Sequence, residues 1–365
     1  MIALRGSALA MAIALATATC DGGDRVAPPP QAVTTRLPPA NPQAVLKMAQ
    51  GVAAAKEGQR DRAIALLREA LLVDENLWEA RYDLGVVLAS GGDLASAEDE
   101  LVKAAKLAPE AVEVTMALAE VQRRRGENKA AAEALGQYIA KHPQSVEART
   151  AYVAALRDSG QVDKAIAQAK ELLARKPGDA SALAELALCH LAKGERDTAA
   201  LLAKQALDGN AKSAVAERAQ GLIALGAGDD AIAFRAFQKA TQEDPRDTTA
   251  RMNMGAVLLR AGAYAKAAEQ FRAILQTSPD DDDAAVGLGA ALRGEGDAQH
   301  PQKFDEARGV LEKVLARDPH HVSALYNLAV LYGDYLKKPD QAIPLYRRFL
   351  SDAPSDHKSR VEAER

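Results

Sequence analysis

Residues 214–247 read AVAERAQGLIALGAGDDAIAFRAFQKATQEDPRD, and residues 248–281 read TTARMNMGAVLLRAGAYAKAAEQFRAILQTSPDD. Each block is 34 residues long, and the two can be laid over one another. Their matching landmarks are Gly221, Ala233, Phe237, Ala240 and Pro245 in the first block and Gly255, Ala267, Phe271, Ile274 and Pro279 in the second. Because all these positions shift together, the stretch indicates a repeated structural unit and not one enlarged core.

The same frame extends in both directions from this stretch. Closing prolines recur at Pro109, Pro143 and Pro177, and Ala211 stands where the missing one is expected. After Pro279 the spacing lengthens, because the eighth repeat carries six extra residues in its internal turn (294–303) and the ninth carries one near Lys337. The predicted repeats are 44–77, 78–111, 112–145, 146–179, 180–213, 214–247, 248–281, 282–321 and 322–356.

Each repeat has the features of two antiparallel helices. We number its positions as places 1 to 34 from the first residue of the repeat. Gly or Ala at place 8 and Ala at place 20 would let the two helices approach closely, and large apolar residues at places 7 and 24 would fill the layer between them. Proline ends the second helix because it cannot continue the backbone hydrogen bonding. We therefore expect Ala233 and Ala267 to be structural residues at close helix contacts.

This period and this order of landmarks resemble the tetratricopeptide repeat superfamily. The resemblance implies an all-α fold, a right-handed α-solenoid of about nine helix–turn–helix repeats over residues 44–356. A polar cap or tail follows at residues 357–365. The resemblance implies binding surfaces and not one particular chemistry, because this fold serves many functions.

The first residues are typical of a secretory signal. Arg5 precedes a short apolar run, Ala8 to Ala18, which is well below the roughly 20 residues needed to span a bilayer. Residues 1–19 are therefore predicted to be a signal peptide, and Cys20 resembles the lipidated cysteine of a bacterial lipobox. Cleavage after Ala18 is the alternative, since Ala16-Thr17-Ala18 also fits an ordinary signal-peptidase site.

Residues 20–43 are predicted to be a lipidated, proline-rich tether. Proline-rich chains favour extended geometry of about 3.1 Å per residue, so this segment would hold the solenoid up to roughly 70 Å from its anchor. We expect a location in the cell envelope, facing the periplasm. Asp21 would favour the inner membrane by enteric rules, but the sequence leaves open which membrane holds the anchor.

The composition and motifs argue against several functions. The formal net charge of −4 has the wrong sign for nonspecific binding to nucleic acid. Phosphate-loop, nucleophile-elbow and zinc-helix motifs do not occur in register, so we predict no catalytic residue, no metal and no cofactor. The acids from Asp280 to Asp283 are interpreted as a helix cap, Cys189 as a small core residue, and His320 with His321 as surface residues.

In solenoids that resemble this chain, places 2, 5, 9, 12 and 13 of each first helix line the concave face. In repeats three and four these places hold a mixed charged wall: Glu113, Glu120, Arg123, Arg124, Glu147, Arg157 and Asp158. In repeats five to seven the candidate partner-binding groove is Leu188, Leu191, Arg218, Leu222, Leu225, Met252, Leu259 and Arg260. An exposed apolar strip would dock an apolar or amphipathic helix. The alternative is that these leucines belong to the core between repeats.

The predicted function is a noncatalytic scaffold or assembly factor of an envelope complex. One alternative is a noncatalytic subunit of a complex that processes or exports peptidoglycan or polysaccharide, and another is a chaperone that delivers an outer-membrane component. Residues 324–336 and 342–346 are similar to the tetratricopeptide lipoproteins of the myxobacterial gliding machinery, which implies a motility machine as one setting. Protein partners and a membrane anchor are expected, and no nucleic acid or small-molecule cofactor.

Overall fold

The computed structural model describes residues 39–365, which form one compact unit. The predicted signal peptide, Cys20 and all of the tether except residues 39–43 lie outside the described residues. No helix within residues 39–365 is both long and apolar enough to cross a membrane. The chain is helical throughout this part, with helices joined by short turns.

The first helices of the nine repeats are α1 Pro42–Lys56, α3 Trp78–Ser90, α5 Val112–Arg124, α7 Val146–Asp158, α9 Ala180–Ala192, α11 Ala214–Ala227, α13 Thr248–Arg260, α15 Asp282–Glu295 and α17 Val322–Val330. The second helices are α2 Arg60–Val73, α4 Leu94–Leu107, α6 Asn128–Lys141, α8 Val162–Arg175, α10 Arg196–Gly209, α12 Asp230–Glu243, α14 Tyr264–Thr277, α16 Gln302–Arg317 and α18 Pro339–Asp352. A π-helix, η1 (Leu331–Tyr335), and a last short helix, α19 (Arg360–Glu364), complete the set. The predicted all-α solenoid is confirmed, and α1 begins at Pro42, two residues before the predicted start of repeat one.

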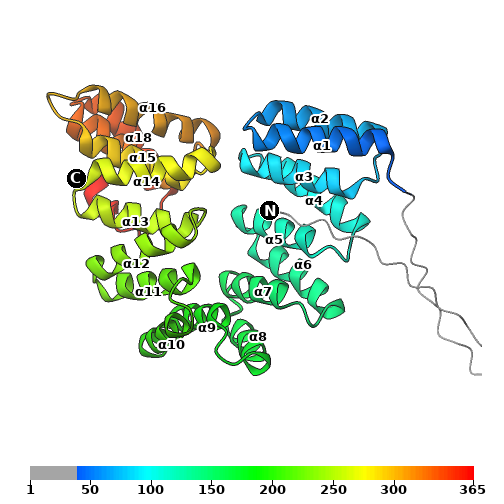
Figure 1. Ribbon diagram of the computed structural model, residues 1–365. Helices are drawn as coiled ribbons and strands as arrows, with labels where there is room; N and C mark the ends of the chain where they lie inside the picture. Colours follow the sequence, from blue (N-terminus) through cyan, green and yellow to red (C-terminus); the bar gives the residue numbers. More distant parts are fainter. Residues whose placement is uncertain (1–38) are drawn as a thin grey trace, which may run out of the picture. The chain divides into compact units, whose positions relative to one another are not determined.

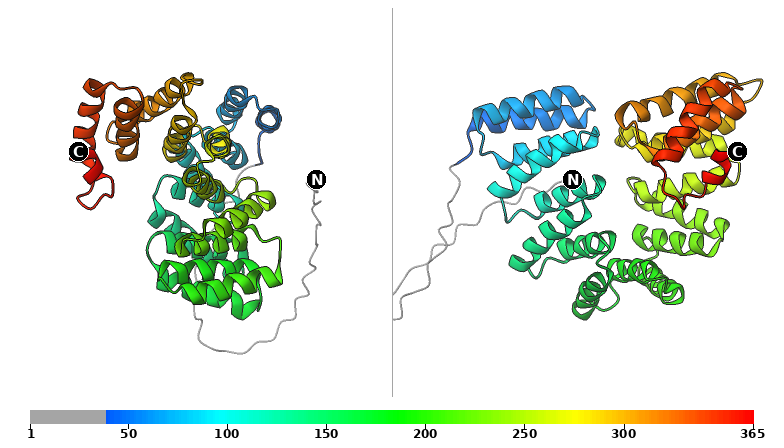
Figure 2. Two further views of the ribbon diagram at one scale, coloured as in Figure 1. Left: turned by 90° about the vertical axis from the view of Figure 1, so that its left-hand side faces the viewer. Right: turned by 180° about the vertical axis from the view of Figure 1, so that it is seen from behind.

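The helices pack in sequence order. Each first helix contacts the second helix of its own repeat and then the next repeat, so the core is a continuous layer and not a single centre. Figure 1 shows the pairs following one another from α1 and α2 to α16 and α18 as a curved stack, and Figure 2 shows the same stack from the side and from behind. The first helices supply the concave side on which the candidate groove lies.

Small residues at place 8 permit this packing. An ideal Cβ on Gly221 would lie 2.5 Å from the Phe237 ring, and one on Gly255 would lie 2.7 Å from the Phe271 ring. Both rings are fully buried, as are Ala233 and Ala267. The prediction that these two alanines are structural residues at close helix contacts is confirmed by their burial.

Polar residues end the turns between repeats and begin the next helices. Asp247 Oδ1 accepts a hydrogen bond from the Ala250 amide at 2.9 Å, and Asp281 Oδ1 accepts one from the Ala284 amide at 2.8 Å. These bonds satisfy amides that have no partner within the helix. Capping by the acidic run after Pro279 is thereby confirmed for Asp281.

The two longer repeats take up their extra residues in different ways. In repeat eight, residues 296–301 form a loop between α15 and α16, as the sequence predicts. In repeat nine, the first helix widens into η1 over Leu331–Tyr335, and Lys337 adopts a left-handed φ of 53°. A π-helical turn holds one more residue than an α-helical one, so the extra residue is absorbed there without breaking the helix.

The C-terminal residues cover the end of the stack. Tyr326 Oη donates a hydrogen bond to Glu362 Oε2 at 2.5 Å, and Ala363 packs on the cluster around Leu325 and Phe349. Arg360 Nη1 donates to the carbonyl oxygens of two residues just after α18 and within its last turn. The predicted cap at residues 357–365 is therefore built around α19.

Candidate functional site

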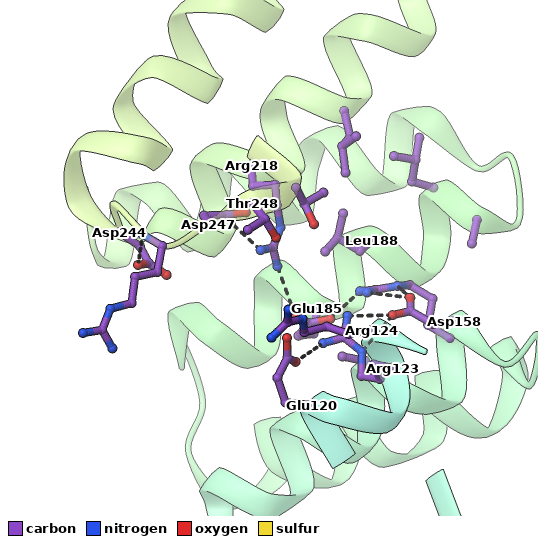
Figure 3. A pocket seen from close by; sticks show the side chains of 17 residues that line it. Glu120, Arg123, Arg124, Asp158, Glu185, Leu188, Arg218, Asp244, Asp247 and Thr248 are labelled. Atoms are coloured by element: carbon purple, nitrogen blue, oxygen red, sulfur yellow. Dashed lines mark hydrogen bonds and ion pairs between the residues drawn. The ribbon is translucent and has the colours of Figure 1, made fainter. Parts of the chain in front are cut away.

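A groove of about 750 Å³ runs along the first helices of repeats three to seven. Figure 3 shows its side chains converging from α5, α7, α9 and α11 and from the start of α13. The charged and polar residues that line it are Glu120, Arg123, Arg124, Arg157, Asp158, Glu185, Arg218, Asp244, Arg246, Asp247, Thr248 and Thr249. The apolar residues that line it are Ala154, Leu188, Leu191, Ala192 and Leu222.

Ion pairs connect successive repeats along this groove. In the first part, Arg123 Nη1 lies 3.0 Å from Glu120 Oε2, and Arg123 Nη2 lies 2.8 Å from Asp158 Oδ2. Asp158 Oδ1 then lies 2.8 Å from Arg157 Nη2 (Figure 3). A carboxylate shared by two guanidinium groups fixes α5 against α7, because each group is held in a charge-assisted hydrogen bond.

The second part continues from Arg157 into repeats five to seven. Arg157 Nη1 lies 2.5 Å from Glu185 Oε2, and Glu185 Oε1 lies 3.9 Å from Arg218 Nη2. Arg218 Nη1 lies 2.8 Å from Asp247 Oδ2, so the cap of α13 is also the end of this series. We call the seven residues the ion ladder: Glu120, Arg123, Arg157, Asp158, Glu185, Arg218 and Asp247.

The middle of the ion ladder is shielded from solvent. Glu185 and Asp247 are buried, and Arg157 and Arg218 are half-buried. Burial acts to lower the pKa of Arg157, but the carboxylates of Glu185 and Asp158 outweigh it and raise this pKa. Separating such a pair would leave a buried charge without compensation, which is unfavourable. The side chains of the ladder are therefore held in their paired positions.

Arg124 lies at the edge of the groove and reaches two distant segments. Its Nη1 donates to the Ala89 carbonyl at 2.9 Å, and its Nη2 donates to Ser278 Oγ at 3.0 Å. Ala89 belongs to α3, whereas Ser278 follows α14. This side chain therefore connects repeats two and three with the end of repeat seven.

The structure brings four of the eight predicted groove residues together. Leu188, Leu191, Arg218 and Leu222 line the groove, and Arg218 takes part in the ion ladder. Leu225, Met252 and Leu259 do not line it; they are half-buried against the core of repeats six to nine. Arg260 lies outside the groove and pairs with Asp230 at 2.6 Å. Whether any of these residues binds a partner stays a prediction.

The prediction that the apolar residues of the candidate groove form an exposed strip is wrong. Leu188 is only 5% exposed and packs with alanines of α9, α10 and α11, and none of the other five apolar residues is exposed. The physical reason is the closeness of successive first helices, whose side chains at places 5, 9 and 12 pack on the neighbouring repeat. These residues belong in large part to the core between repeats, which was the alternative interpretation.

Other candidate residues take structural positions. Burial raises the pKa of the Cys189 thiol to about 12, so the thiolate, which is the reactive form, is disfavoured. His321 Nδ1 accepts a hydrogen bond from the Ala324 amide at 3.3 Å, and His320 Nδ1 lies 2.9 Å from Asp352 Oδ2. Among residues 39–365, no group of three or more His, Cys, Asp or Glu side chains is placed to hold a metal ion.

The chain matches one family of known proteins. The profile described as tetratricopeptide repeat matches residues 48–112, 99–146, 116–179, 150–214, 218–282 and 302–357, which together make up more than half of the chain. No curated protein matches the chain. The repeats of this family act as protein-interaction scaffolds, and the fold is generally noncatalytic.

Solved structures share the architecture at low sequence identity. The Cut9–Hcn1 hetero-tetramer of the APC/C is 15% identical, with a TM-score of 0.55 over 88% of this chain and 76% of that one. YrrB, described as a tetratricopeptide repeat protein with an unusual peptide-binding site, is 21% identical, with a TM-score of 0.38 over 53% of this chain and 97% of that one. PilF of Pseudomonas aeruginosa is 18% identical, with a TM-score of 0.49 over 60% and 97%. Only the first of these TM-scores exceeds 0.5, and that likeness concerns the fold alone.

Sequence reasoning missed two members of the ion ladder. Glu185 and Asp247 do not stand at the places predicted to line the concave face, yet they join the charged wall of repeats three and four to Arg218. The sequence does hold a signal for Glu185, because it is the one polar residue in the otherwise apolar stretch 182–189. A lone buried acid on such a helix requires a cationic partner nearby.

Proposed function

The chain belongs to the tetratricopeptide repeat family, and from this premise we propose that it is a noncatalytic scaffold that binds a segment of a protein partner in the groove of repeats three to seven. The observation that carries the proposal is the groove itself. It crosses five first helices, and the ion ladder fixes its side chains before any partner arrives. A preformed site avoids part of the entropy cost of ordering side chains on binding.

The charges of the groove favour a partner segment of mixed charge. Both signs reach solvent at the repeat-three end, where the side chain of Glu120 is more than half exposed and that of Arg123 about a third exposed. Arg246 and Asp244 are exposed at the other end. Among the larger apolar side chains that line the groove, only Leu191 and Leu222 are partly exposed, beside the small Ala154 and Ala192. A segment that carries acids and bases would therefore fit better than the apolar helix expected from sequence.

Site-specific photo-crosslinking tests this proposal. A photoreactive residue would replace Thr249, which lines the groove, and in a second chain Leu201, which is exposed and does not line it. We expect a crosslinked protein partner from the Thr249 position and none from Leu201. A partner that crosslinks only from Leu201 would place the binding surface outside the groove.

We further propose that Cys20 anchors the scaffold in the cell envelope, with the solenoid facing the periplasm. The support is the sequence of residues 1–43, and the similarity of residues 324–336 favours a motility machine as the setting. One acyl chain gives only marginal membrane binding and two or more make it stable, so a Cys20 that carries at least two chains would anchor the protein by itself. Cys20→Ser should move the protein from the membrane to the soluble periplasmic fraction. Retention in the membrane fraction would contradict lipidation as the anchor.

The alternative function is a noncatalytic subunit of a complex that processes or exports peptidoglycan or polysaccharide. The groove would be the same in that setting, and only the partner protein would differ. Mass spectrometry of the crosslinked product distinguishes the two settings, because an enzyme would then appear as the captured protein. A zymogram of the purified chain tests whether it has activity of its own, and we expect none.

A further inference from the structure

Repeats two and three contact the end of repeat seven, far away in the sequence. At the end of α5, Arg124 Nη2 donates to Ser278 Oγ at 3.0 Å, across a separation of 154 residues. In the turn after α3, an ideal Cβ on Gly92 would lie 2.5 Å from Asp280 Oδ2, so this carboxylate lies against the backbone of the turn. Figures 1 and 2 show the cyan and yellow parts of the stack approaching each other at this level. Because the repeats of a solenoid usually contact only their neighbours, this contact closes repeats two to seven into a loop.

The two sides of this contact carry opposite charges. The side formed by the end of repeat seven bears the four acids of residues 280–283. The other side bears Arg124 and also Arg60, whose guanidinium group lies against Gly91 in the turn after α3. Burial raises the pKa of the Asp281 carboxyl, and the nearby positive charge of Arg124 acts against that rise. The contact is therefore electrostatically complementary.

Apolar packing does not hold the two sides together. Within residues 39–365, no hydrophobic cluster contains side chains from both sides: one cluster belongs to repeats one to three, and another to repeats six to nine. Arg124 is exposed, and exposed hydrogen bonds and ion pairs are individually weak because water competes for them and salt screens them. The contact can therefore open and close while the repeats on both sides stay folded.

We propose that Ala89, Gly92, Arg124, Ser278 and Asp280 form a clasp that controls entry into the groove. Arg124 links the two, because it lines the groove and also makes the clasp's hydrogen bonds. While the clasp is closed, a partner segment can enter the loop only by threading a free end, whereas the open form also admits an internal segment from the side. A segment that binds only the open form has its affinity reduced by the fraction of chains that are open. This control of partner entry rests on the proposed function, but the clasp itself does not.

Opening of the clasp is measured as a distance between two spin labels in the full chain with Cys20→Ser. The labels are attached to Leu72→Cys in α2 and Ile343→Cys in α18, at positions that are both exposed. The remaining Cys189 is buried, and its raised thiol pKa disfavours labelling there. Double electron–electron resonance then gives the distribution of distances between the two ends of the stack.

Arg124→Ala should raise the ratio of open to closed chains about tenfold, because it removes two hydrogen bonds made by a charged group. The distribution should then move to longer distances. Ser278→Ala removes one of these bonds from the other side, and we expect a rise of about threefold. Arg125→Ala is the matched control, because Arg125 pairs with Glu98 of repeat two at 2.5 Å and takes no part in the clasp. An unchanged distribution in Arg124→Ala, or an equal shift in Arg125→Ala, overturns the proposal.

A size-selective reagent tests whether the clasp controls access to the groove, and it needs no partner. Ala154 lines the groove and is half-buried, so Ala154→Cys in the Cys20→Ser chain reports on access. Ser278→Ala opens the clasp without changing the lining of the groove, and it should speed the reaction with a polyethylene glycol maleimide about threefold relative to N-ethylmaleimide. An unchanged ratio of the two rates overturns the control of the groove by the clasp. Failure of the photo-crosslinking at Thr249 would instead contradict partner binding in the groove and leave the clasp in place.

Discussion

Gly255 lies against Phe271 so closely that no side chain fits between the two helices that carry them. An ideal Cβ on Gly255 would lie 2.7 Å from the ring of Phe271. The ring has no room to retreat, because it is fully buried and Gly287 of the next repeat lies against it at a similarly short approach. One aromatic side chain is thus held between two repeats by two glycines.

Gly255→Ala should destabilise the protein. Alanine gains about 1 kcal/mol of helix propensity, but the overpacked ring costs about 1 to 3 kcal/mol, and the second effect is expected to be the larger. Gly309→Ala in α16 is the matched control, because a Cβ there would meet nothing within 4 Å. It should raise the melting temperature, whereas Gly255→Ala should lower it. Equal shifts in the two variants would contradict the close contact.

Glu185→Ala should be among the most destabilising changes in the groove. The carboxylate is buried and holds Arg157 at 2.5 Å and Arg218 at 3.9 Å. Its removal leaves the half-buried Arg157 with Asp158 alone, which we expect to cost about 3 kcal/mol in urea unfolding. Asp230→Ala, which removes the exposed partner of Arg260, should cost about 0 to 1 kcal/mol. Similar losses in both variants would mean that the ion ladder is no better shielded than a surface pair.

Asp83 should make the stability depend on pH. Burial, with Glu79 nearby, raises the pKa of this carboxyl from 3.8 to about 6, against the opposing effect of Lys56. The folded state then binds the proton more tightly than the unfolded state, so this contribution to stability is greatest below pH 3.8 and is lost as the pH rises through 6. Asp83→Asn should therefore melt higher than the parent at pH 7.

Solvent screening limits how much stability Asp83→Asn gains at pH 7. Asp83 is only half-buried, and screening reduces the expected gain at pH 7 to about 1 kcal/mol. The difference between the variant and the parent should disappear below pH 3.8, where both carry a neutral side chain at this position. A difference in melting temperature that is the same at pH 3.5 and pH 7 would contradict the raised pKa.

Much of the fold could be predicted because the landmarks recur. The spacing of Ala233 and Ala267 placed both at helix contacts, and both are fully buried. The distance between the closing prolines predicted that repeat nine holds an extra residue, but it did not predict where in the repeat that residue is accommodated. A widened turn at η1 and a left-handed Lys337 accommodate it together, and spacing alone does not choose between a longer loop and a wider helix.

The groove was harder to predict than the fold. Helical spacing told which residues share a face, and it placed Arg123, Arg157 and Asp158 on the charged wall where the structure has them. It did not tell how closely the next repeat covers that face, so Leu188 was taken for an exposed residue although it is buried. The partner of Arg157 in repeat five depends on the rotation from one repeat to the next, which no local pattern contains.

The proposed function rests on the binding of a partner in the groove of repeats three to seven. Its most direct test is partner capture by a chain with Glu120→Arg and Arg123→Glu, which reverses the ion pair at one end of the groove. The control is Arg260→Glu with Asp230→Arg, the same reversal of an ion pair outside the groove. With helical content unchanged in both, we predict that the first variant captures at least about tenfold less partner and that the control captures as much as the parent. Equal capture by all three chains would contradict the claim.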